Sequence, residues 1–240
     1  MWPDIGEIRN FYATDRGAAV CQVINLRLRS LWPAVRGHDL IGIGYTTPYL
    51  PQFQDAGLMA AFSPAPMGGH VWPLEGLRKV AIVEEDEWPL PDSSIARILL
   101  VHCLEFVGDT ENFLRELWRV LIPGGRVMVI VPHRRSLWAQ SELSPFGYGQ
   151  PFSASQLQQL FSKQMFRSRL VGRGLHLPLW WPKPGVNIAL NIERYGVKWT
   201  KGLGGLLFME AEKELYGAVP WKNKTRKMRF ALSNLPLKPA

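Results

Sequence analysis

The sequence contains little cysteine: Cys21 and Cys103 are the only two in 240 residues. They are far apart and form no C-x-x-C spacing, which argues against a disulfide framework and against a cysteine zinc site. The sequence also lacks an apolar run of about 18 residues and a basic segment followed by an apolar one at its start. We therefore expect neither a membrane span nor a signal peptide, and a location in the reducing cytoplasm.

Acidic residues are absent from residues 221–240. That segment holds six lysines and arginines, whereas the whole chain carries a net charge of +8, so residues 1–220 carry only +2. Such a distribution suggests local electrostatic attachment of the basic tail to anionic lipid, nucleic acid or an acidic protein. The alternative is a tail that is simply solvated. No motif for reading a nucleic-acid groove occurs, which makes nucleic acid the weaker candidate partner.

Hydrophobic residues make up 47% of the chain and include 10 tryptophans and 11 phenylalanines, which excludes a disordered or fibrous protein. Runs 98–101 and 127–131 are apolar at every position, which indicates strands covered on both faces, as in a parallel sheet. Parallel strands need crossover connections, so we expect helices between them. The first five predicted strands are residues 38–44, 57–62, 79–85, 96–101 and 126–131.

Three segments have the apolar period of an amphipathic helix. The first covers residues 17–32, and the second covers residues 109–121, where Asp109 or Thr110 can cap. The third begins at Ser153, which can form a capping box with Gln156. The remaining predicted elements are strands at 166–171 and 205–210 and a helix-like stretch at 186–195.

Two glycines, Gly42 and Gly44, end the first predicted strand in the sequence D-L-I-G-I-G-Y-T-T-P. Glycines at such a position permit a positive φ and let a ligand approach the backbone, at the edge where open α/β sheets bind ligands. The alternative is a tight turn with no ligand. The five histidines show no spacing typical of a metal site, so we expect no bound metal.

Residues 84–132 strengthen the ligand interpretation. They contain, in order, the acidic turn E-E-D-E-W-P-L-P-D-S-S-I, the apolar run I-L-L-V-H, and L-R-E-L-W-R-V-L-I-P-G-G followed by a strand. This order closely resembles that of class I S-adenosylmethionine-dependent methyltransferases of the small-molecule type. The helix that begins at Ser153 also resembles one in that family, so the resemblance covers roughly residues 38–212.

The resemblance implies an α/β, Rossmann-like fold with a seven-stranded, mostly parallel sheet, flanking helices and an antiparallel last strand. It implies one methyltransferase-like domain over residues 1–220, with residues 1–36 as an N-terminal helical cover and 166–204 as a partly inserted cover. It also implies S-adenosylmethionine as the cofactor. The implied cofactor-binding residues are Gly42, Gly44, Tyr45, Ser63, Glu84, Glu85 and His102. Of these, Glu84 occupies the position of the acid that contacts the adenine amine, and His102 is the only candidate catalytic residue.

The sequence departs from the family pattern at three cofactor positions. Leu40 replaces the acid before the first glycine, Thr46 replaces the third glycine, and Ser63 stands near the position of the missing ribose-binding acid. Loss of charged hydrogen bonds to a ribose costs ~1.5–3 kcal/mol, or roughly ten- to a hundredfold in affinity. Binding is thereby weakened but not abolished.

Three functional hypotheses follow. The first is methyl transfer to a small or lipid-like molecule, in a nucleoside-sized crevice at the ends of the first, third and fourth strands. The second is a catalytically weak or inactive methyltransferase-like protein that binds and regulates a protein partner, and it predicts a crevice filled by the protein's own side chains. The third is a membrane- or nucleic-acid-binding module that uses the basic tail.

Overall fold

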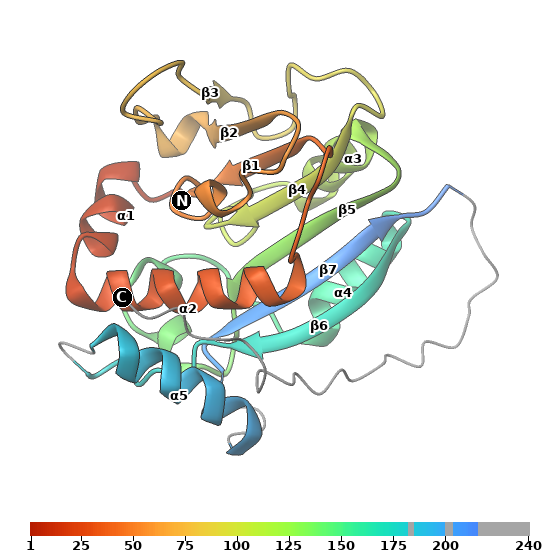
Figure 1. Ribbon diagram of the computed structural model, residues 1–240. Helices are drawn as coiled ribbons and strands as arrows, with labels where there is room; N and C mark the ends of the chain where they lie inside the picture. The colour runs from red at the N-terminus through yellow and green to blue at the C-terminus, as the bar shows by residue number, and fades with distance from the viewer. Residues whose placement is uncertain (182–184, 200–203, 216–240) are drawn as a thin grey trace.

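The computed structural model describes residues 1–181, 185–199 and 204–215, and the predicted basic tail lies outside them. One seven-stranded sheet forms the centre, with the strand order β3-β2-β1-β4-β5-β7-β6 (Figure 1). Strands β1 to β5 are parallel, and β7 is antiparallel to both of its neighbours. The predicted Rossmann-like sheet with an antiparallel last strand is therefore confirmed. The strands are β1 (Leu40–Gly44), β2 (Met59–Pro64), β3 (Val80–Val83), β4 (Ile95–Val101), β5 (Leu121–Pro132), β6 (Phe166–Gly174) and β7 (Leu206–Lys213).

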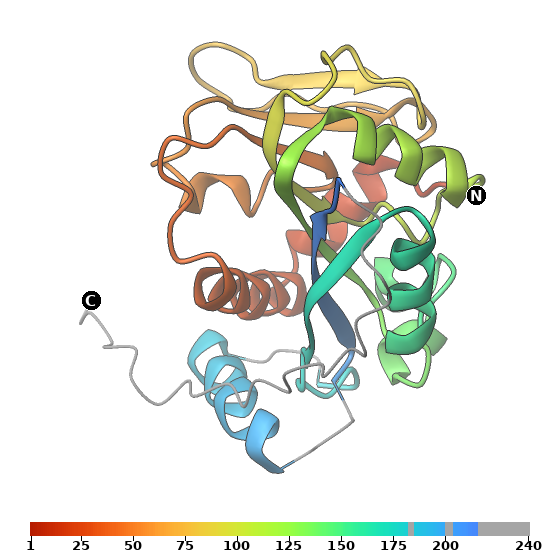
Figure 2. The ribbon, with the colours of Figure 1, turned by 90° about the vertical axis from the view of Figure 1, so that its right-hand side faces the viewer.

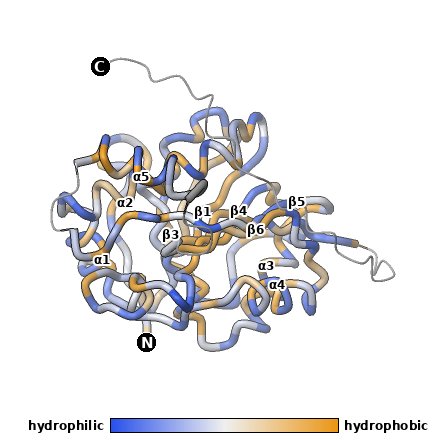
Figure 3. The backbone as a smooth tube through the Cα atoms, turned by 90° about the horizontal axis from the view of Figure 1, so that it is seen from below, coloured by the Kyte–Doolittle hydropathy of each residue, from blue (hydrophilic) through white to orange (hydrophobic). Residues whose placement is uncertain are grey.

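Helices cover both faces of the sheet (Figure 2). One face packs against α3 (Thr110–Val120) and α4 (Ala154–Lys163), and the other packs against α2 (Asp15–Leu31) and α5 (Val186–Trp199). Apolar strands lie between these two layers (Figure 3). A shorter helix, α1 (Ile5–Tyr12), precedes α2. No helix in the described part of the chain is long and apolar enough to cross a membrane.

The helix starts follow the local sequence. Asp109 caps α3 by accepting hydrogen bonds from two backbone N–H groups, and Ser153 and Gln156 form the predicted capping box of α4. The docking of α5 depends on a contact that the sequence did not reveal. Arg27 of α2 donates from Nε to Glu193 Oε1 of α5 at 2.6 Å, and both side chains are buried.

The predicted helices between neighbouring parallel strands form only at one place, where α3 connects β4 to β5. The connections from β1 to β2 and from β2 to β3 contain only single 3-10 turns, Leu50–Gln52 and Ala65–Met67. The connection from β3 to β4 contains no helix. Prolines explain the difference, because they interrupt all three connections, and glycines also interrupt the first two. Helix α2, which precedes β1 in the chain, covers β1 and β4 instead.

Candidate functional site

The loops that follow β1, β2, β3 and β4 meet at the carboxyl edge of the sheet, because these strands are parallel. Helix α1 and the residues before it lie across this edge (Figure 1). Trp2 donates from its indole N–H to Glu85, which follows β3, and the Tyr12 hydroxyl lies 2.9 Å from His102 Nε2, which follows β4. The N-terminal segment thus spans from the end of β3 to the end of β4.

Side chains of α1 fill the middle of this edge. Ile5 and Ile8 pack against Tyr45, which follows β1, and Met67, which follows β2, and all four are buried. The predicted strand ends therefore do come together, but the space between them is not an open crevice. We call this cluster of Ile5, Ile8, Tyr45 and Met67 the α1 plug.

The glycine loop folds tightly at the edge of β1. Gly44 has φ +86°, and a Cβ at Gly42 would overlap the Thr46 hydroxyl. The Thr46 side chain is fully buried, and its Oγ1 has no hydrogen-bond partner among the described residues. A buried hydroxyl without a partner is costly, so Thr46 Oγ1 is a candidate group for binding a ligand over Gly42.

Ser63 stands at the end of β2, near where the resemblance expects a ribose-binding acid. Its hydroxyl donates to the backbone carbonyl of Gly68, and the side chain is buried. This bond ties the end of β2 to the loop that follows it. The Ser63 hydroxyl can still accept a hydrogen bond from a cofactor, but it can donate one only if the loop at Gly68 moves.

Glu84 and Glu85 follow β3 and differ in their surroundings. Glu84 is exposed and lines a cavity of 320 Å³ together with Ala65, Trp88 and Pro89. Glu85 accepts from Trp2 and from the backbone N–H of Gly108, so it holds the N-terminal segment against the sheet. Glu84 is the predicted residue that remains free to bind a ligand at this end.

Arg119 of α3 is a positioning residue that the sequence analysis missed. Its guanidinium donates to Glu116 Oε2 at 2.7 Å and to the backbone carbonyls of Leu90 at 2.9 Å and Trp88 at 3.2 Å. Glu116 also accepts from the backbone N–H of Trp88 at 2.8 Å. Arg119 belongs to the R-V-L-I-P-G-G segment, and its contacts fix the acidic turn that shapes the cavity beside Glu84.

Replacing Arg119 with lysine should lower the free energy of unfolding by about 1–3 kcal/mol, because an ammonium cannot make this set of forked hydrogen bonds. Urea unfolding measures the change. Arg115→Lys is the matched control, since Arg115 pairs on the same helix with Glu111, and their side chains are 63% and 61% exposed. We expect the control to change stability by less than about 0.5 kcal/mol. Equal effects of the two substitutions would contradict the role of Arg119.

His102, the predicted boundary residue, is completely buried at the end of β4 and has φ +49°. Its ring packs against Phe146 with a centroid distance of 4.4 Å. Tyr49 donates its hydroxyl proton to the Tyr12 oxygen at 2.7 Å, so the Tyr12 hydroxyl in turn donates to His102 Nε2. The proton of the imidazole then lies on Nδ1, which is 3.7 Å from Glu105 Oε1.

Burial changes the protonation of His102 and Glu105. It lowers the pKa of His102 to about 3 and raises the pKa of Glu105 to about 8. The imidazole is therefore neutral near pH 7, and the carboxyl group is largely protonated. Neither His102 Nδ1 nor Glu105 Oε1 has a hydrogen-bond partner among the described residues.

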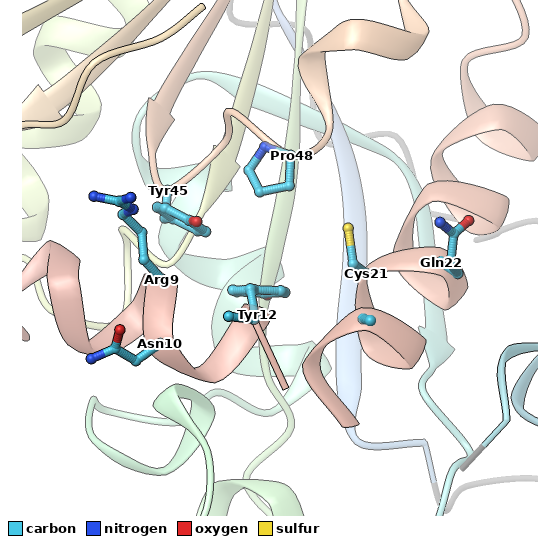
Figure 4. Close-up of a pocket in the computed structure, with 9 residues that line it drawn as sticks. Arg9, Asn10, Tyr12, Cys21, Gln22, Tyr45 and Pro48 are labelled. Atoms are coloured by element: carbon cyan, nitrogen blue, oxygen red, sulfur yellow. The ribbon is translucent and has the colours of Figure 1, made fainter. Parts of the chain in front are cut away.

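A second cavity, of 490 Å³, lies between α1 and α2 (Figure 4). Its lining comes from α1, α2 and the loop after β1, and it includes Tyr12 and Tyr45, whose rings stack 5.3 Å apart. Burial raises the pKa of Tyr45 to about 12, and the nearby Arg9 opposes that rise. No described residue forms a hydrogen bond or ion pair with the Arg9 side chain. The other lining residues are Asn10, Ala13, Ala18, Cys21, Gln22 and Pro48.

The structure thus brings Gly42, Gly44, Tyr45 and His102 together and places Glu84 at the far end of the same edge. No group of three potential metal-binding side chains occurs within residues 1–181, 185–199 and 204–215. The sequence analysis missed the role of Thr46 Oγ1. It also missed the buried polar side chains that follow one another from Tyr49 through Tyr12 and His102 to Glu105. Only the identity of Thr46, at a position where glycine was expected, could have signalled the first of these.

Residues 73–129 match a family model described as a methyltransferase domain. A methyltransferase of Thermotoga maritima, described as a possible histamine N-methyltransferase, is 19% identical with a TM-score of 0.59, over 88% of this chain and 96% of that one. A putative methyltransferase of Haloferax volcanii, solved with the Trm112 methyltransferase activator, is 16% identical with a TM-score of 0.57, over 83% and 93%. No curated protein sequence matches. The chain therefore has the fold of class I S-adenosylmethionine-dependent methyltransferases.

Proposed function

We propose that this chain is an S-adenosylmethionine-dependent methyltransferase whose N-terminal helix covers the cofactor crevice and must move for the cofactor to bind. The observation that carries the proposal is the convergence of the loops after β1 to β4 at one edge, within a fold and a matched segment of methyltransferase type. The Thr46 hydroxyl and the cavity beside Glu84 fit the two ends of such a cofactor. The α1 plug occupies the space between those ends.

S-adenosylmethionine, when bound, supplies a methyl group on a positively charged sulfur, which needs no activation by the protein. The protein must hold and orient the cofactor and the methyl acceptor, and it must exclude water from both. Glu84 would accept a hydrogen bond from the adenine amine, and the loop from Gly42 to Thr46 would hold the methionine end. His102 is neutral and would shape the apolar boundary with the acceptor, and its Nε2 is an acceptor that Tyr12 uses in the closed structure.

We place the methyl acceptor in the 490 Å³ cavity, which has a volume typical of small-molecule sites. Alanines, a proline and two tyrosines give it a largely apolar lining, and Arg9 stands at its side, where no described residue forms an ion pair with it. These features favour an acceptor with an apolar body and an acidic or polar group, which includes lipid-like molecules.

Calorimetry with S-adenosylhomocysteine tests the proposal. We expect binding at or below millimolar concentration, and Glu84→Ala should weaken it about tenfold through loss of one charge-assisted hydrogen bond. Glu75→Ala is the control, because Glu75 is exposed and lies in the loop before β3. Equal affinities of the two variants would remove Glu84 from the site.

A second candidate function is a methyltransferase-like protein without catalysis, and the α1 plug favours it. In that case the buried contacts of α1 are a permanent part of the core, and the fold serves as a surface for a regulated protein partner. Failure of S-adenosylhomocysteine to bind at millimolar concentration, both to the wild type and to a variant with a loosened α1, would establish this alternative over methyl transfer.

A further inference from the structure

The two edge strands of the sheet, β3 and β6, differ in chemistry. Exposed arginines, Arg167, Arg169 and Arg173, occur along β6, and charged side chains on an edge strand oppose pairing with another chain. In contrast, β3 carries Ile82, whose side chain is 60% exposed. Among the described residues, β3 pairs with β2 on one side and with no strand on the other. It is therefore the unprotected edge.

The loop before β3 carries further exposed apolar side chains. Val71, Leu74 and Leu77, in the loop before β3, are 56%, 80% and 86% exposed. The backbone of this loop touches the strand at Gly69, which packs closely against the Ile82 side chain. We call Val71, Leu74, Leu77 and Ile82 the β3 patch. Several large apolar side chains exposed within one segment of the chain, residues 71–82, favour an interaction surface there.

The charges around β3 run from positive to negative along the strand. Arg78 and Lys79 precede the apolar residues of β3, and the acidic residues 84–87 follow them. Lys79 and Asp86 are exposed, and neither side chain makes a hydrogen bond or ion pair with a described residue. Such a strand is complementary to itself in antiparallel pairing, because the basic end of one copy lies against the acidic end of the other.

We propose that the β3 patch is the interface with a second copy of this chain. The two β3 strands pair antiparallel about a two-fold axis perpendicular to the sheet, with Ile82 opposite Ile82 of the second copy. Lys79 of each copy then lies opposite Glu85 of the other, Arg78 lies opposite Asp86, and the apolar side chains of both patches are buried. Two-fold pairing of this kind gives a closed dimer with one continuous sheet.

The size of the interface limits its strength. A four-residue strand and four apolar side chains cover less than the ~800 Å² per partner of a standard stable interface. We therefore expect a dissociation constant on the order of 10 µM, where the dimer forms in a concentration-dependent way. Ile82 also lines the cavity beside Glu84. The interface is therefore tested by the association state of the protein and not by cofactor binding or methyl transfer.

Sedimentation velocity of the full chain between about 1 and 200 µM tests the interface, a range that brackets the expected dissociation constant. We expect the wild type to change from monomer to dimer, and Ile82→Lys to remain monomeric throughout, because two lysines would face each other across the axis. Leu143→Lys is the matched control, since Leu143 is also 60% exposed and lies outside the patch, and it should dimerise like the wild type.

Charge reversal tests the direction of pairing. Arg78→Glu and Asp86→Arg should each raise the dissociation constant about tenfold, and the double variant should restore it, because the opposite charges are re-formed with their signs exchanged. A wild-type protein that stays monomeric up to 200 µM overturns the interface. A dimer that survives Ile82→Lys, or binding of β3 to another protein or to a membrane in place of self-association, also overturns it.

Discussion

The Ile8→Ala variant should bind S-adenosylhomocysteine at least thirtyfold more tightly than the wild type. Ile8 is fully buried in the α1 plug, and its truncation removes about 2–4 kcal/mol from the packed state of the helix. If α1 must leave before the cofactor binds, the free energy of the contacts that hold α1 in place is subtracted from the binding free energy of the cofactor. A loss of about 2 kcal/mol in closure then appears as roughly a thirtyfold gain in affinity.

Ile24→Ala provides the matched control, because Ile24 is also fully buried but lies in α2, away from the α1 plug. Both variants should unfold at lower urea concentration, and only Ile8→Ala should gain affinity in calorimetry. If the affinity of Ile8→Ala equals that of the wild type, α1 does not compete with the cofactor. The proposed movement of α1 would then be wrong even if methyl transfer were observed.

The second large effect concerns Glu105, whose pKa is raised from the ordinary value of 4.5 to about 8 by burial. Between these values the folded protein binds more protons than the unfolded chain, so the free energy of unfolding falls as the pH rises, by at most about 1.4 kcal/mol per pH unit. His102 has the opposite effect, because burial lowers its pKa from 6.5 to about 3, and stability rises with pH between those values. The two effects oppose each other between pH 4.5 and 6.5, and the effect of Glu105 alone remains up to about pH 8.

Glu105→Gln should therefore abolish the loss of stability between about pH 6.5 and 8 and gain about 2 kcal/mol over the wild type across that interval. Urea unfolding at pH 5, 6.5 and 8 measures the effect. The control is Glu111→Gln, since the Glu111 side chain is 61% exposed. This substitution should change the free energy of unfolding little at any of the three pH values. Stability curves of wild type and Glu105→Gln that run parallel over this range would show that Glu105 is not the titrating group.

Much of the fold could be predicted from local patterns. The all-apolar runs of β4 and β5 indicated strands with two covered faces, and the caps at Asp109 and Ser153 marked the starts of α3 and α4. These features depend on neighbours in the sequence, so they are readable without tertiary contacts. The expectation of a helix in each connection was wrong where prolines and glycines interrupt the chain, and those residues were themselves visible in the sequence.

The candidate site was less predictable. Gly42, Gly44 and Glu84 could be assigned positions because they lie in or near the segment that resembles methyltransferases. The contact between Tyr12 and His102 joins positions far apart in the chain, and so does the ion pair of Arg27 with Glu193. No local pattern marks such pairs, because they depend on how whole elements pack.

The sequence by itself indicated parallel strands covered on both faces and the edge at which a ligand would bind, since hydrophobic period and turn residues act over a few positions. The seven-stranded sheet with its antiparallel last strand was implied by the resemblance to methyltransferases. Only the tertiary structure decided what occupies that edge. Helix α1 lies there because its two isoleucines find an apolar partner surface in Tyr45 and Met67, and because Tyr12 satisfies the buried His102. Whether a helix closes a crevice depends on the free energy of such distant contacts, which the order of residues does not display.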